Sequence, residues 1–280
     1  MKEFLSDKDI SNYPSIELDK LNDIFLLDSL SKDYRDKNFD IYNFNGTGVP
    51  RVSSILKECI AKEYLINWAS KIGYKRYNIL KNKATHIGTI VHEMIERFLL
   101  NGEDENYIKN ISATEFYYSN NILKAYENFK SWYFNLINKG YTMEVIEIEK
   151  KVTCPYYGGT IDCIAKINGK VYIIDFKTSK QISYEYIIQT CAYMWIINNG
   201  YCNDISHIDG IGIIRVDKEK TKFNDLFLNN HIPYQKEIID QYYKGFASLL
   251  MSYYNNINMK YIFSEYNKLY NFDDTILLNY

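Results

Sequence analysis

The chain has 280 residues, of which 46% are hydrophobic and 24% charged, which is the composition of a globular protein with at least one sizeable core. A disordered, collagen-like or disulfide-scaffold protein is thereby excluded. The formal net charge of −2 conceals an asymmetry, since residues 1–40 carry six Lys/Arg against ten Asp/Glu. Residues 51–83 carry eight Lys/Arg against two Glu. An acidic leader therefore precedes a basic segment.

The cysteines and the amino-terminal residues indicate in which cellular compartment the protein acts. Five cysteines are widely spaced without a Cys-x-x-Cys pair, which disfavours a disulfide framework and a zinc or iron–sulfur site. The first residues lack the apolar stretch of a signal peptide and are too acidic for a mitochondrial presequence. No apolar run reaches the ~18 residues that a membrane-spanning helix needs. We therefore expect a cytoplasmic protein without a membrane partner, or one that acts in a nucleus or, if encoded by a virus or phage, in the host cytoplasm.

The predicted elements begin with helices. Residues 1–45 form an expected acidic accessory segment, in which a few apolar residues predict one helix. Ser53 and Ser54 then precede apolar residues at helical spacing, which is typical of a helix start. Gly73 is expected to end this helix.

Two further helices are predicted before the first strand. One begins within residues 85–89 and ends at Leu100, because its apolar residues recur every three or four positions. The other covers residues 120–138 and ends at Gly140. The amino-terminal half of the main domain is therefore expected to be helical.

The hydrophobic period then changes from 3.6 to 2, which predicts strands. The first strand covers residues 143–152, with Glu149 among its polar positions. Residues 160–167 and 170–177 form two further strands, joined by Asn168-Gly169, a strong signal for a two-residue hairpin turn.

The last predicted elements are a helix over residues 184–198, a strand over 208–216 and a helix over 233–256. The order helix, three strands, helix, strand, helix favours one mixed α/β domain. We place this domain at residues 46–258, with a tail over residues 259–280.

The hairpin turn determines which residues face each other. With a two-residue loop at 168 and 169, the numbers of cross-strand partners sum to 337, and so do 162 and 175. Asp162 and Asp175 should therefore lie opposite each other, with Cβ atoms about 5 Å apart. Two such charges repel by ~3 kcal/mol at an effective dielectric constant near 20, so the pair is unfavourable unless a cation lies between them or one acid is protonated. A divalent cation is their natural partner.

Lys177 lies two residues after Asp175 and therefore on the same face of its strand. Its ammonium group could orient an attacking water or stabilise negative charge on a phosphate. A structural interpretation is also open, in which Lys177 only neutralises Asp175 on a solvated hairpin face.

Four motifs that follow one another in the chain resemble a known family. They are Gly88-Thr89-Ile90-Val91-His92, Gly159-Thr160-Ile161-Asp162, Ile174-Asp175-Phe176-Lys177-Thr178-Ser179 and Gln189-x-x-Ala192-Tyr193. The set is similar to the PD-(D/E)XK nuclease superfamily in its RecB-like branch, and most similar there to the mitochondrial genome-maintenance exonuclease and related phage exonucleases. The resemblance spans residues 49–195, about half of the chain. It implies an α/β fold with a restriction-endonuclease-like core, a mixed central sheet flanked by helices, and helical additions at both termini.

The resemblance also implies a catalytic Mg²⁺ or Mn²⁺ beside Lys177, the motif lysine. The implied ligands are His92, Asp162, Asp175 and the main-chain carbonyl of Phe176, with Glu149 as a further candidate. Oxygen ligands suit these hard ions, and one imidazole is compatible with Mn²⁺. By itself, His92 on an apolar helix would more often be a hydrogen-bonded core residue. RecB-like nucleases that hold an iron–sulfur cluster have a carboxy-terminal group of cysteines. No such cluster is expected here, because no cysteine follows Cys202.

Several other positions are candidate substrate contacts, each with packing or a solvated surface as its alternative. They are Gln189, Tyr193, Ser53, Ser54, Gly159, Thr178, Lys75 and Arg76. A serine at a helix start could hold a phosphate, and Gly159 would let a ligand approach the backbone. The basic segment 51–83 interleaves its cations with aromatic residues, a combination typical of channels for single-stranded nucleic acid.

Together these observations predict a metal-dependent DNA exonuclease that acts on single-stranded DNA or frayed duplex ends in replication, recombination or repair. One alternative is an endonuclease, either of restriction type or acting on RNA. Another is a nucleic-acid-binding or scaffold protein with a degenerate nuclease site.

Overall fold

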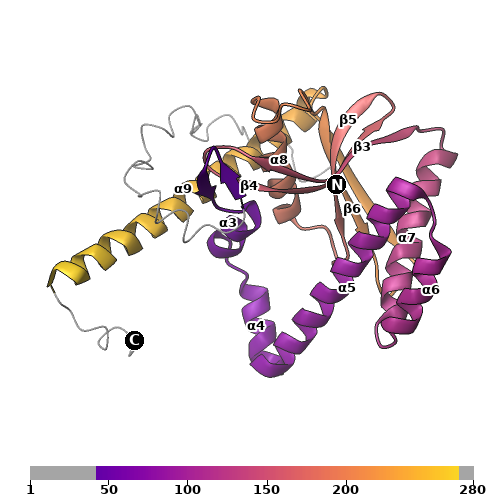
Figure 1. The fold of residues 1–280 in the computed structure, drawn as a ribbon, viewed down its shortest axis with the longest axis horizontal. Coiled ribbons are helices and arrows are strands. Elements are labelled where there is room, and N and C mark those ends of the chain that lie inside the picture. The colour runs from indigo at the N-terminus through magenta and orange to yellow at the C-terminus, as the bar shows by residue number, and fades with distance from the viewer. Residues whose placement is uncertain (1–41, 271–280) are drawn as a thin grey trace.

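The computed structural model describes residues 42–270 and places the side chains of residues 42–264. Its elements are β1 (Tyr42–Phe44), β2 (Thr47–Val49), α3 (Val52–Cys59), α4 (Glu63–Ile72), α5 (Tyr74–Asn101), α6 (Glu105–Thr114), α7 (Ser119–Asn138), β3 (Met143–Thr153), β4 (Gly158–Ile167), β5 (Lys170–Lys177), α8 (Tyr184–Asn198), β6 (Gly210–Val216), β7 (Phe223–Asn229) and α9 (Pro233–Tyr270). Figure 1 shows α4, the start of α5 and the end of α9 extending from the body that contains the sheet. The helix expected in the accessory segment falls outside the described residues.

Five strands form the central sheet in the order β3-β4-β5-β6-β7. Neighbouring strands are antiparallel except β5 and β6, which are parallel. A parallel pair needs a long crossover connection, and α8 supplies it. This mixed sheet with flanking helices confirms the predicted α/β fold.

Alternation along the central strands produces a core on each face of the sheet. Ile211 and Ile213 of β6 pack with α3, α8 and α9 on one face. Ile214 and Val216 pack with α5 and α7 on the other face. Because both faces are covered, polar side chains at the ends of these strands are held in a rigid frame.

The basic segment forms two helices rather than the single one expected. The chain becomes extended at Ile60, after α3, and α4 begins at Glu63. Arg51 is the N-cap of α3 and makes no side-chain capping bond, so Ser53 and Ser54 lie inside the first turn instead of capping it. No residue of α4 is buried, and packing on the core therefore does not hold α4 in line with α3.

Other differences from the prediction concern element ends and short strands. Helix α5 begins at Tyr74 rather than within residues 85–89, and α9 continues to Tyr270 rather than ending at residue 256. The sequence does not predict four elements, β1, β2, α6 and β7. The first three are short, and β7 interrupts the apolar alternation with Asn and Asp. Over the part of the chain that the structure describes, no helix combines the length and the apolar character that crossing a membrane requires.

Candidate active site

Side chains from α5, β3 and β4 converge beside the sheet. His92 on α5, Glu149 on β3 and Asp162 on β4 each offer one possible ligand atom, and these atoms lie within 4.8 Å of one another. All three were candidate metal ligands in the sequence, and the fold brings them together from three separate elements.

The hairpin between β4 and β5 has the predicted register. The five pairs from Ile167 with Lys170 to Cys163 with Ile174 share the sum 337. Asn168 and Gly169 both have positive φ, 47° and 79°, as the Asn-Gly hairpin turn requires.

Beyond the pair Cys163 and Ile174, the main-chain pairing of β4 with β5 ends, and the side chain of Asp162 takes its place. The Phe176 N–H donates to Asp162 Oδ2 at 2.9 Å, so the carboxylate rather than a carbonyl satisfies this donor. From Tyr172 to Lys177, β5 pairs with β6. Asp162 is therefore fixed against β5 while its other oxygen stays free of this bond.

Asp175 is a buried carboxylate with one unsatisfied oxygen. The residue is 3% exposed, and its Oδ1 accepts a hydrogen bond from Lys177 Nζ at 2.6 Å. Its Oδ2 is buried and has no hydrogen-bond partner among the described residues. Burial raises the pKa of Asp175 to about 7, with Lys177 acting to lower it and Asp162 to raise it. A buried carboxylate oxygen left unpaired is costly, and a bound cation would compensate it.

Lys177 is held as an ammonium by the acids beside it. Burial acts to lower its pKa, but Asp175 and Asp162 outweigh this effect, and the pKa of Lys177 lies above its ordinary value. The Nζ atom also lies 5.1 Å from the centre of the Tyr186 ring, within cation–π distance. The lysine is thus a fixed positive charge directly beside the carboxylates.

His92 is positioned to present a neutral ring. Its Nδ1 lies 3.5 Å from Asp162 Oδ2, and its ring contacts Phe176 edge to face. Burial lowers the pKa of His92 and Lys177 lowers it further, against opposing effects of Asp162 and the Phe176 main chain. A neutral imidazole has a lone pair available for a metal ion.

Glu149 reaches the same place through an irregularity in β3. The register between β3 and β4 shifts between Val145 and Glu147, and Glu149 itself has φ of 49°, a conformation that non-glycine residues rarely adopt. Burial, followed by Asp162 and Glu96, raises the pKa of Glu149. Strained residues of this kind cluster at functional sites.

The residues present fit a divalent cation. Glu149, Asp162 and His92 could supply two carboxylate oxygens and one nitrogen from their common group, and Asp175 adds a buried, unpaired carboxylate oxygen. The main chain of Phe176 lies against the His92 ring. When ionised, these acids carry more negative charge than Lys177 neutralises. Carboxylates with a single imidazole match the ligand preferences of Mg²⁺ and Mn²⁺.

Gln189 and Tyr193 brace the site from α8. Gln189 Nε2 donates to the Tyr193 hydroxyl at 3.2 Å, and Tyr193 is 4% exposed. A Cβ on Gly159 would lie only 2.3 Å from the Tyr193 ring, so this glycine is needed for packing and not to leave an open approach. Thr178 lies against Gly88, which is one helical turn before His92. A Cβ added to Gly88 would lie 3.5 Å from the Thr178 hydroxyl oxygen.

The other sequence candidates lie apart from the acids. Ser53 and Ser54 are on α3, which packs on α8 and α9. Lys75 and Arg76 are exposed at the start of α5, on the projecting pair of helices. Their roles as substrate contacts stay predictions.

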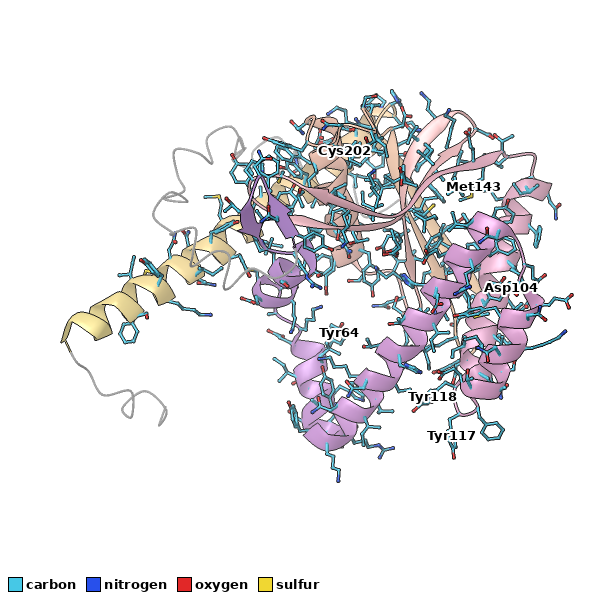
Figure 2. The ribbon with its side chains drawn as sticks, viewed as in Figure 1. Tyr64, Asp104, Tyr117, Tyr118, Met143 and Cys202 are labelled. Atoms are coloured by element: carbon cyan, nitrogen blue, oxygen red, sulfur yellow. The ribbon has the colours of Figure 1, made fainter. Side chains whose placement is uncertain are left out.

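An aromatic pocket opens beside Tyr186, whose ring centre lies 5.1 Å from Lys177 Nζ. It has a volume of about 810 Å³ and lies between α4 and the segment 179–186 that follows β5. Tyr64 and Trp68 of α4 line it, and Tyr64 is 67% exposed. Figure 2 shows Tyr64 on the side of α4 that faces the body. An ion pair of 2.6 Å between Lys62 and Glu185 ties the two walls together.

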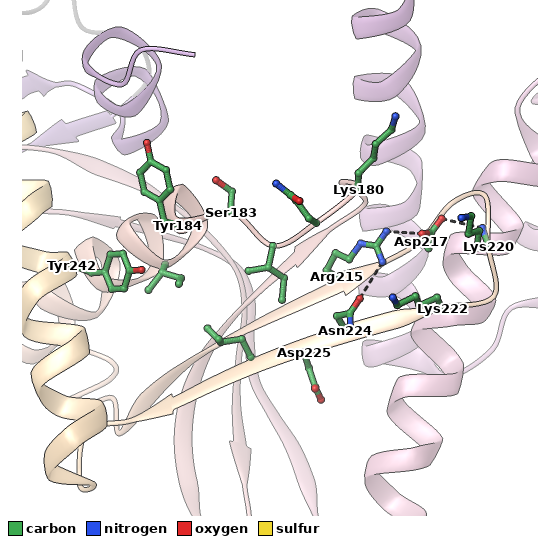
Figure 3. Close-up of a pocket in the computed structure, with 14 residues that line it drawn as sticks. Lys180, Ser183, Tyr184, Arg215, Asp217, Lys220, Lys222, Asn224, Asp225 and Tyr242 are labelled. Atoms are coloured by element: carbon green, nitrogen blue, oxygen red, sulfur yellow. Dashed lines mark hydrogen bonds and ion pairs between the residues drawn. The ribbon is translucent and has the colours of Figure 1, made fainter. Parts of the chain in front are cut away.

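A cationic pocket that sequence reasoning missed lies on the other side of segment 179–186. Its volume is about 710 Å³, and Figure 3 shows Lys180, Lys220 and Lys222 around it. The buried Arg215 organises this region, since it donates to the Ser179 carbonyl at 2.7 Å and pairs with Asp217 at 2.6 Å.

Lys180 and Lys218 line an adjoining pocket of about 250 Å³, and Lys83 is close enough to act electrostatically on Lys218. Burial lowers the pKa of Lys218, and the charges of Lys83 and Lys180 add to this effect, while Glu219 and Asp217 oppose it. The three lysines come from the β6–β7 connection, from α5 and from the segment after β5. Because these lysines are 38 residues or more apart in the chain, their spacing in the sequence does not predict that they come together. We call Lys83, Lys180 and Lys218 the lysine cluster.

Comparisons with known proteins identify the family of this chain. Among solved structures, the chain is similar to SSO0001 (14% identity, 63% of this chain and 87% of that chain, TM-score 0.25). It is also similar to the alkaline exonuclease LHK-Exo from Laribacter hongkongensis (12% identity, 46% and 67% covered, TM-score 0.26) and to LHK-Exo in complex with dAMP (11%, 62% and 92%, TM-score 0.28). No curated protein matches the sequence. A family model matches residues 69–258, most of the described chain including all the acids above, and the chain belongs to the PD-(D/E)XK nuclease superfamily.

Proposed function

We propose that this nuclease is a metal-dependent exonuclease that hydrolyses phosphodiester bonds of single-stranded DNA or frayed duplex ends. The observation that carries the proposal is the buried Asp175 carboxylate. One of its oxygens holds Lys177 and the other has no hydrogen-bond partner among the described residues, beside the converging His92, Glu149 and Asp162.

His92, Asp162, Asp175 and the Phe176 carbonyl would hold Mg²⁺ or Mn²⁺, with Glu149 as an additional ligand. The ion, when bound, supplies a Lewis acid for the phosphate oxygens and lowers the pKa of a bound water. Asp175 orients Lys177, whose ammonium can donate to the attacking water or to a phosphate oxygen. Tyr193 and Gln189 keep β4 and α8 in place beneath these groups.

The surroundings of the site support a nucleic-acid strand as the substrate. The aromatic pocket at Tyr64 and Trp68 can stack unpaired bases, and the lysine cluster can neutralise phosphates. The aromatic pocket borders segment 179–186, and Lys180 of the cluster belongs to this segment, which begins two residues after Lys177. A strand that contacts both regions would pass the catalytic lysine.

The finer placement within the superfamily is also a proposal. The four motifs, from His92 to Tyr193, favour the RecB-like branch and a relationship to the mitochondrial genome-maintenance exonuclease and phage exonucleases. A role in replication, recombination or repair follows from that placement.

Cleavage assays on matched linear and circular substrates test the proposal. We expect end-labelled linear single-stranded DNA to be degraded with Mg²⁺ or Mn²⁺, closed single-stranded circles to survive, and no cleavage in EDTA. Lys177→Ala should be inactive, whereas Asp240→Asn, on the exposed face of α9, should retain activity.

Each alternative has its own outcome in the same assay. Cutting of closed circles would indicate an endonuclease, and cutting of RNA alone would indicate a ribonuclease. Binding without cutting under every metal would indicate a scaffold protein. Cleavage that persists in EDTA or with Lys177→Ala would refute the mechanism.

A further inference from the structure

A second convergence of histidine and carboxylate lies at the opposite end of the parallel strands. His207 and Asp209 precede β6, and His231 follows β7. Their possible ligand atoms all lie within 4.8 Å of one another. Asp209 neighbours Val171 at the start of β5, four residues before Asp175, which separates the two places by about 13 Å along an extended strand.

We propose that His207, Asp209 and His231 form a second metal site that binds a divalent transition-metal ion such as Zn²⁺. Two imidazoles and one carboxylate are a ligand set that Zn²⁺ accepts in tetrahedral geometry, and they leave a fourth position for water. The same set disfavours Mg²⁺ and Ca²⁺, which prefer oxygen ligands. This proposal is independent of the proposed nuclease chemistry.

The carboxylate is held in place by the main chain. Asp209 Oδ2 accepts a hydrogen bond from the Val171 N–H at 2.7 Å, which leaves Oδ1 directed at the histidines. The Asp209 N–H donates to the Val171 carbonyl, and the Asn230 N–H donates to the Asp209 carbonyl, both at 2.7 Å. Main-chain hydrogen bonds thus hold the segments that carry Asp209 and His231 together before any ion binds. Ion binding therefore has to order fewer backbone and side-chain conformations.

Both histidines approach the same carboxylate oxygen. His231 Nε2 contacts Asp209 Oδ1, and His207 Nε2 lies 3.8 Å from it. The two rings are 6.2 Å apart between centroids and inclined at 60°, so they do not stack. The histidine side chains are 52% and 51% exposed, which gives an ion an open path to the nitrogens.

One neighbouring charge opposes a cation. Lys170 Nζ lies 3.9 Å from Asp209 Oδ1. Its side chain is 46% exposed, so it can turn towards solvent when an ion replaces it. A bound ion would connect the segment before β6, the start of β5 and the segment before α9, and would therefore stabilise the attachment of α9 to the sheet.

Calorimetric titration of the full metal-stripped chain with Zn²⁺ tests this site. His207→Gln/His231→Gln should lose one equivalent of bound Zn²⁺, and the matched control His86→Gln, an exposed histidine paired with Glu115, should keep it. At about a hundredfold excess of Zn²⁺ over its dissociation constant, the melting temperature of the wild type should rise by roughly 5 °C, and this rise should disappear in the double variant. Mg²⁺-dependent cleavage should be retained by the double variant.

Two additional variants keep the outcome interpretable. His207→Gln alone removes a half-exposed ring that touches Asp209 only at 3.8 Å, so it should fold normally and weaken Zn²⁺ binding at least tenfold. Asp162→Asn should abolish cleavage yet keep this Zn²⁺ equivalent, so failure of the nuclease proposal and failure of this site are distinguishable. The proposal is overturned if the double variant binds as much Zn²⁺ as the wild type, or if the wild type binds none beyond what Asp162→Asn removes.

Discussion

The buried Asp175 carboxylate should make the metal-free protein less stable than a neutral variant. Asparagine preserves the size of the side chain and removes the charge. The pKa of Asp175 rises from 3.8 to about 7 in the folded protein, chiefly through burial. At 1.36 kcal/mol per pKa unit, the ionised form therefore costs about 4 kcal/mol of folding free energy above pH 7.

The sign of the pH dependence follows from the direction of this shift. Because the folded pKa of Asp175 exceeds the unfolded value, the folded state binds more protons between the two values. The contribution of Asp175 to stability therefore falls as pH rises through this window and is constant above it. In EDTA near pH 8, Asp175→Asn should be more stable than the wild type by up to about 4 kcal/mol, and the difference should shrink by ~2 kcal/mol near pH 5.5.

Urea unfolding at several pH values measures this difference. The control is Asp240→Asn, since Asp240 pairs with Lys236 on the exposed face of α9 and its replacement should change stability by no more than about 0.5 kcal/mol. Saturating Mg²⁺ should stabilise the wild type more than Asp175→Asn, because the variant lacks one of the proposed carboxylate ligands. A variant that is less stable than the wild type in EDTA, by an amount independent of pH, would refute this reasoning.

Three other changes have distinct expected results. Lys177→Met should reduce single-turnover cleavage by roughly a hundredfold or more while Mn²⁺ binding persists. The reason is that the ammonium, in the proposed mechanism, acts on water or phosphate and is not a metal ligand. Equal losses of cleavage and of Mn²⁺ binding would contradict this role. Gly159→Ala should lower the free energy of unfolding by about 1–3 kcal/mol in a denaturation experiment, because its Cβ would lie 2.3 Å from the Tyr193 ring; unchanged stability would show that the ring moves freely. Tyr64→Ala should weaken single-stranded DNA binding by about 1–3 kcal/mol in anisotropy titrations, whereas Tyr117→Ala, 87% exposed between α6 and α7, should bind normally. Equal effects of the two tyrosine variants would argue against the aromatic pocket as the binding surface.

The hairpin of β4 and β5 could be predicted because the residues that determine it are neighbours in the sequence. The Asn168-Gly169 turn determines the register, and the period of two assigns the faces of the strands. The same signal is present at Asn45-Gly46, which has φ of 47° and 82° and joins β1 to β2. That hairpin was not predicted, because its strands are too short for an alternating pattern to stand out.

Other parts of the fold depend on contacts between distant segments. The first turns of α5 are polar and basic on most sides, so an apolar period does not mark its start at Tyr74. The left-handed backbone of Glu149 has no signature in its own sequence, although the position was a candidate ligand. The lysine cluster and the group His207, Asp209 and His231 each bring together segments that are far apart in the sequence. Sequence spacing alone could therefore not assemble them.

A crystal structure of the protein with Mn²⁺, using the anomalous scattering of the ion, tests the central claim most directly. We expect an anomalous peak within ligand distance of His92, Asp162 and the Asp175 oxygen that is unpaired in the metal-free site, and no peak there in Asp175→Asn crystals. A wild-type structure in which this oxygen stays without a metal ligand while Mn²⁺ supports cleavage would contradict the account.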